Sequence, residues 1–143
     1  MSRAENVADS VNTLLGAYLL RDADGHARAL PYNPLDYQVL RFVGGHPRAR
    51  ATDIAASVRV SATTMQSALD RLVRKGLLSK SRSETDGRAR LYALSDEGER
   101  VRADIRAQDV RNMEAILATL PDDEADTLAR LLAKVAGEIA ARG

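Results

Sequence analysis

The sequence predicts a mostly α-helical fold of the α+β class, in which one small pair of strands interrupts a series of helices. Apolar residues recur at helical spacing through most of the chain. Two short segments with helix-start residues are joined by a tight connection at residues 59–60. Two strand-like runs, residues 77–82 and 90–94, then flank an Asp-Gly turn signal. This order predicts a winged helix-turn-helix, with the hairpin as its wing.

Length and composition limit the function classes. The 143 residues, 45% of them apolar, suit one domain or one domain with an oligomerisation arm. No apolar run approaches the roughly 18 residues of a membrane span, and the start has no signal-peptide core, so we expect a cytoplasmic protein. The absence of Cys excludes disulfides, thiol catalysis, thiol redox sensing and Cys-based zinc sites.

The first two helices are predicted from spacing and caps. One is expected from Glu5 to about Leu20, followed by a Gly- and Pro-containing loop over residues 22–32. Asn33 is a typical helix cap and Pro34 suits the first helical position, so a second helix starts there. Gly44-Gly45 ends it.

Two short helices then form the predicted helix-turn-helix. Thr52 is expected to cap the first, and Ser61 the second, which runs over residues 62–75. Gly76 ends the second helix. Its core face is expected to carry Met65, Leu69 and Leu72, so its polar residues point elsewhere.

The C-terminal third predicts two more helices. Ser95 is expected to cap a long one, Pro121 breaks it, and Asp122 is expected to cap the last. Both helices carry apolar stripes, formed by Val101, Ile105, Met113, Ile116, Leu117 and Leu120 and by Leu128, Leu131, Leu132, Val135 and Ile139.

The apolar stripes suggest that the single unit of 143 residues consists of two lobes. Residues 33–95 form the predicted DNA-binding lobe, and residues 1–22 and 96–143 the helical dimerisation lobe. Left uncovered, the stripes would expose a large apolar patch, which a two-fold homodimer would bury. The alternative is that they pack only on their own domain.

Charge is concentrated in the middle of the chain. Residues 48–92 hold ten basic and four acidic side chains, a net charge of +6, against −5 for the remainder. A basic middle favours contact with phosphates, the alternative being a solvated surface with chance clustering.

The helix-turn-helix and hairpin predict which residues contact DNA. Short polar side chains in the first turns of the second helix can read base edges, and Gln66 can bond adenine. Wing Arg side chains can enter the minor groove, and Asp86 can orient one of them through a charge-assisted bond. The alternative is ordinary caps and an exposed turn. The predicted contacts are Thr52, Ser61, Thr63, Thr64, Gln66, Ser67, Arg71, Arg74, Lys80, Arg82, Arg88 and Arg90.

The chain resembles the MarR family of bacterial winged-helix regulators. The residues that carry the resemblance are Val60-Ser61-x-Thr63-Thr64-Met65, the run from Leu69 to Leu78, Asp86-Gly87-Arg88, and Leu94-Ser95-Asp96-Glu97-Gly98. The resemblance implies a homodimer on a pseudo-palindromic operator, and an effector bound between lobes. The family often has Arg where Ser67 stands, so base readout would depend more on Gln66 or the wing.

Other sites are less well marked. A small aromatic or anionic effector is expected near Tyr18, Tyr37, Phe42 and Met113, although such residues are more often core. His26 and His46 lack metal-ligand spacing, and no catalytic constellation is present, so no cofactor, metal or enzyme activity is expected. The prediction is a homodimeric, effector-modulated repressor. A constitutive repressor and a protein-interaction module without DNA binding are the alternatives.

Overall fold

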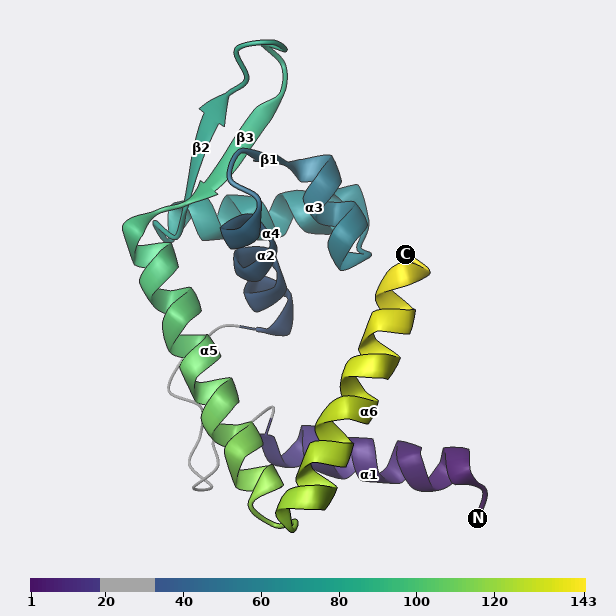
Figure 1. Cartoon of the computed structure of the whole chain (residues 1–143). Coiled ribbons are helices and arrows are strands. Elements are labelled where there is room, and N and C mark those ends of the chain that lie inside the picture. Colours follow the sequence, from purple (N-terminus) through teal and green to yellow (C-terminus); the bar gives the residue numbers. More distant parts are fainter. Residues whose placement is uncertain (19–32) are drawn as a thin grey trace. The chain divides into compact units, whose positions relative to one another are not determined.

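The structure is a computed structural model that describes residues 1–18 and 33–143 (Figure 1). The chain divides into two compact units, Tyr32–Arg106 and Met1–Pro31 with Ala107–Gly143. Helix α5 (Asp96–Leu117) continues from one unit into the other. The division therefore falls within α5, whereas the sequence suggested a boundary at residues 95–96.

The first unit is a winged helix-turn-helix. Its elements are α2 (Pro34–Gly45), β1 (Ala49–Arg50), α3 (Ala51–Val58), α4 (Ala62–Arg74), β2 (Leu78–Arg82), β3 (Arg90–Leu94) and the start of α5. The strands form an antiparallel sheet in the order β1-β3-β2, and Tyr92 of β3 lies between Ala49 and Lys80. Strand β1 was not predicted, because two residues are too few to show alternation.

Three predicted helix caps are confirmed. The Asn33 side chain accepts a hydrogen bond from the Asp36 N–H at 2.8 Å. Ser61 Oγ accepts from the Thr64 N–H at 3.1 Å, and Ser95 Oγ accepts from the Gly98 N–H at 3.0 Å. Each bond satisfies a donor that the first helical turn leaves without a partner.

Two predicted caps are wrong. Helix α3 already begins at Ala51, one residue before Thr52, because Arg50 leaves β1 in an extended conformation and takes the cap position itself. Asp122 is the first residue of α6 (Asp122–Ala141), whose cap position is occupied by Pro121. Neither helix start has a side-chain cap bond, and local propensity placed the first cap two residues too late and the second one residue too late.

The core of this unit is aliphatic apart from one Tyr. Helix α4 buries Met65, Leu69 and Leu72 completely, as its spacing predicted. They share the core with Val39, Leu40, Val43, Ile54, Leu77, Leu78, Leu91, Tyr92, Val101 and Ile105. The predicted apolar stripe of α5 is therefore divided, because its first two members belong to this core.

A tight junction joins α4, β2 and α5. Gly76 has a φ of +76°, a conformation that residues with a side chain rarely adopt. The next residue, Leu77, accepts a hydrogen bond from the Ser95 N–H at 3.0 Å, and Ser95 Oγ donates to the Gly76 carbonyl at 2.5 Å. A Cβ atom on Gly98 would overlap the Leu77 carbonyl oxygen, so only glycine fits there.

The second unit consists of α1 (Arg3–Tyr18), the end of α5 and helix α6. Helix α1 starts two residues earlier than predicted. Helix α6 has no buried residue, and α1 carries only exposed side chains over residues 3–17. Among residues 1–18 and 33–143, no helix is long and apolar enough to cross a membrane.

Candidate nucleic-acid interface

Helix α4 separates a buried face from an exposed polar face. Its exposed first turns carry the four residues that were predicted to read bases, Thr63, Thr64, Gln66 and Ser67. The Ser61 cap hydroxyl also donates to Thr64 Oγ1 at 2.9 Å, which fixes that side chain. The opposite face packs in the core, so α4 has one face available for a ligand.

A cleft of about 300 Å³ adjoins this polar face. It brings together α4, the start of α3, both long strands and the wing, and it is lined by Arg50, Ala51, Thr52, Gln66, Lys80, Arg88, Ala89, Arg90 and Tyr92. Four of these residues are basic and none is acidic. A concave surface with this charge attracts polyanions.

The cleft contains five of the predicted contacts, Thr52, Gln66, Lys80, Arg88 and Arg90. Sequence reasoning missed Arg50 and Tyr92 as members of the site. Arg50 had contributed only to the basic charge, because its position depends on the pairing of β1 with β3. Tyr92 lies in a predicted strand, yet nothing local indicates which α4 residue it meets.

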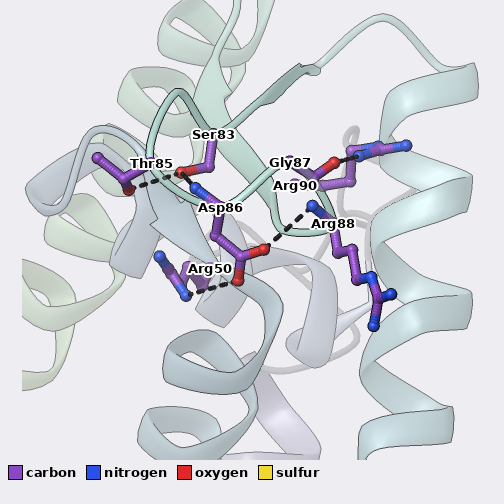
Figure 2. A network of polar contacts seen from close by, with 7 residues as sticks. All are labelled: Arg50, Ser83, Thr85, Asp86, Gly87, Arg88 and Arg90. Carbon is purple, nitrogen blue, oxygen red and sulfur yellow. Dashed lines mark hydrogen bonds and ion pairs between the residues drawn. The ribbon is translucent and has the colours of Figure 1, made fainter.

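Asp86 organises the wing turn, as Figure 2 shows. Its backbone N–H donates to Ser83 Oγ at 3.2 Å, and its Oδ1 accepts from the backbone N–H of Arg88 at 3.1 Å. Its Oδ2 lies 3.9 Å from Arg50 Nη1 on β1. A hydroxyl contact of 3.2 Å between Ser83 and Thr85 completes the turn.

The predicted role of Asp86 is corrected by these contacts. Its side-chain partner is Arg50 rather than a wing Arg, and it holds Arg88 only through the backbone. The Arg90 guanidinium donates to the Gly87 carbonyl at 3.4 Å. Within the described part of the chain, the Arg88 guanidinium has no hydrogen-bond or ion-pair partner, and Figure 2 shows it pointing away from Asp86.

Arg71, another predicted contact, has an internal partner. Its guanidinium forms an ion pair with Asp36 of α2, whose side chain is buried, while the Arg71 side chain is one-third exposed. The pair joins α2 to α4. Arg74, Lys80 and Arg82 are exposed, so their predicted DNA contacts remain sterically open.

The predicted effector residues are distributed over both units. Tyr37 and Phe42 are half-buried on α2, and Phe42 stacks on His46 with ring centroids 4.1 Å apart. Met113 is exposed on the part of α5 that belongs to the other unit. The Tyr18 side chain and His26 lie outside the described residues, so the effector site remains a prediction.

Comparisons with known proteins agree with this geometry. Residues 30–89 match the model of the MarR family. The PcaV transcriptional regulator from Streptomyces coelicolor is 27% identical, with a TM-score of 0.71 over 96% of this chain and 98% of that one. A search of curated proteins gives no match.

Two DNA-bound structures share the fold. CouR, a transcriptional repressor bound to a 23-mer DNA duplex, is 21% identical, with a TM-score of 0.75 over 94% of this chain and 92% of that one. FabT from Streptococcus pneumoniae, in complex with DNA, is 18% identical, with a TM-score of 0.76 over 98% and 96% of the two chains. The fold and the family match lead to one conclusion: residues 30–89 match the MarR family, and the chain has the fold of these winged-helix regulators.

Proposed function

We propose that this protein is a sequence-specific DNA-binding transcriptional regulator that acts by binding rather than by catalysis. The observation that carries the proposal is the basic cleft, in which the polar face of α4 meets the wing without an acidic residue in the lining. CouR and FabT share this fold and are bound to DNA in their structures, and this likeness supports the proposed DNA binding.

The proposed binding mode follows from the two parts of the surface. The first turns of α4 enter the major groove, where Thr, Gln and Ser side chains meet base edges. Arg88 has a guanidinium free for DNA, and a narrow minor groove attracts such a group. The exposed Arg74, Lys80 and Arg82 contact phosphates, which set position and most of the affinity.

The test is the substitution Arg88→Ala, measured by fluorescence anisotropy on the DNA that the wild type selects from a random library. Because a two-fold dimer loses two wing contacts, we expect affinity to fall at least about tenfold. The control is Arg100→Ala on α5, which removes an exposed Arg that pairs with Glu97. Wild-type affinity for Arg88→Ala would exclude the wing contact.

Salt dependence separates this proposal from a protein-interaction module. A protein that neutralises several phosphates loses affinity steeply as salt rises, because condensed counterions are released on binding. We expect a steep decrease between low and physiological salt. Absence of DNA binding at low salt would favour the protein-interaction alternative.

We further propose that the regulator is a homodimer. The exposed apolar residues of the second unit support it: Val7, Val11, Leu14, Leu15, Val110, Met113, Leu131, Leu132, Val135 and Ile139 are each at least 40% exposed. Patches of this extent usually mark an interface. A two-fold interface would also present two α4 helices to two half-sites.

Repression, control by a small aromatic or anionic effector, and location in the cytoplasm complete the proposal. PcaV has been crystallised with its natural ligand and is 26% identical to this chain in that structure. An effector shifts operator occupancy only if its affinity differs between the bound and free conformations. DNA affinity that no compound in a panel of aromatic acids changes would favour a constitutive repressor.

A further inference from the structure

Gln66 is held by two side chains that belong to different elements. Its Nε2 donates to Asp70 Oδ1 at 2.9 Å, one turn along α4, and to the hydroxyl of Tyr92 on β3 at 3.4 Å. Gln66 itself is exposed and lines the basic cleft, whereas Tyr92 is buried in the core. The amide is therefore tied to a rigid part of the protein.

The chemistry of Asp70 determines which way the amide faces. An ionised carboxylate only accepts hydrogen bonds, so the atom opposite it must be the NH2 group of Gln66. The Tyr92 hydroxyl can donate or accept and would tolerate either orientation. Asp70 alone therefore selects the orientation, and Tyr92 stabilises it.

The two bonds use both hydrogens of the Gln66 amide nitrogen. Its Oε1 has no donor among residues 1–18 and 33–143, and it remains available as a hydrogen-bond acceptor. A bidentate bond to adenine needs a free N–H as well as the carbonyl. The expectation that Gln66 bonds adenine in this way is therefore replaced by a narrower role.

We infer that Gln66 is a fixed acceptor that selects an amino base, adenine or cytosine, at one position of each DNA half-site. Adenine offers its N6 amino group and cytosine its N4 amino group in the major groove, whereas guanine and thymine offer acceptors there. Asp70 is the positioning residue for this selection. The inference rests on the proposed DNA-binding function and specifies what its recognition helix reads.

The test is the base preference of the full-length protein and its variants in selection from a random DNA library. The wild type is expected to prefer A and C over G and T by about tenfold at one position per half-site. Gln66→Ala should abolish the preference at that position only. Asp70→Asn should reduce it below about threefold, because an Asn can donate to Gln66 Oε1 and so permits both amide orientations.

Two further variants separate orientation from fold and charge. Tyr92→Phe keeps the buried ring and Asp70, so the preference should weaken without changing direction. Asp104→Asn removes an equal charge from an exposed position on α5 and should leave the preference intact. Without DNA, NMR of the Gln66 side-chain amide should show slower proton exchange in the wild type than in Asp70→Asn.

The outcomes distinguish this inference from the proposed function. A wild type that selects a defined operator but prefers G or T at the Gln66 position overturns the fixed acceptor alone. An unchanged preference in Asp70→Asn does the same. A wild type that enriches no sequence overturns the proposed function together with the inference.

Discussion

Arg71 was predicted to contact DNA, but its guanidinium already has an ion-pair partner within the protein. The ion pair with Asp36 joins α2 to the recognition helix α4. The two partners differ in exposure, because the Asp36 carboxylate is buried whereas Arg71 is one-third exposed and can reach water. Removing either partner therefore has unequal consequences.

We expect Arg71→Ala to lower the free energy of unfolding by about 3 kcal/mol, because it leaves a buried carboxylate without its cation. Asp36→Asn should lower it by only about 1–2 kcal/mol, since the freed guanidinium can be hydrated. The double variant should be more stable than Arg71→Ala alone. Urea unfolding measures all three, and wild-type stability for Arg71→Ala would contradict the role of the pair.

The junction between α4, β2 and α5 depends on two small residues, Ser95 and Gly98. Ser95 caps α5 and also bonds the end of the α4 turn, while Gly98 lies against the Leu77 carbonyl. This contact fixes the direction in which α5 leaves the sheet. It also gives a structural reason for the Leu-Ser-Asp-Glu-Gly run that carries part of the family resemblance.

Gly98→Ala should lower the free energy of unfolding by about 2–3 kcal/mol, because the added methyl group overlaps backbone that has no room to move. Gly137→Ala on α6 is the matched control, since a Cβ atom there meets nothing within 4 Å. That change should stabilise the helix by up to about 1 kcal/mol. Equal thermal shifts for the two variants would contradict the packing argument.

Formation of the proposed dimer depends on helices whose apolar side chains are not buried within one chain. Helix α6 has no buried residue, and its Leu132 and Val135 are 59% and 56% exposed. A two-fold dimer buries each such residue once on each protomer. A single substitution therefore changes both sides of the interface.

Leu132→Glu should raise the dimer dissociation constant at least about 100-fold, because two buried Leu side chains of roughly 1.5–3 kcal/mol each are lost. Ala133→Glu adds the same charge to the face of α6 away from the apolar stripe, and should leave the dimer intact. Analytical ultracentrifugation measures both. A Leu132→Glu protein that stays dimeric would exclude this face as the interface.

Local sequence signals predicted much of the fold. The caps at Asn33, Ser61 and Ser95 are hydrogen bonds that span three residues, so their signal is contained in one short window. The buried face of α4 follows from helical spacing alone. The two misplaced caps, at Thr52 and Asp122, occur where an earlier residue, Arg50 or Pro121, took the cap position without a side-chain bond.

The candidate site was predictable by residue type but not by partner. The sequence predicted that Gln66, Arg88 and Arg90 share one surface, because a helix-turn-helix followed by a hairpin places the recognition helix and the wing side by side. The partners that refine their roles are remote: Tyr92 is 26 residues from Gln66, and Asp36 is 35 from Arg71. Strand β1, which supplies Arg50, exists only through its pairing with β3.

The amino-acid order alone was enough for the winged helix-turn-helix, the polar face of α4 and the family resemblance, because caps, turns and periodicity act over a few residues. Packing between separate elements was needed to pair Arg71 with Asp36, to join Asp86 to Arg50 and to fix the Gln66 amide. Such contacts have no local period. They arise where the chain returns to the same place, and side-chain shape and charge then select the partner.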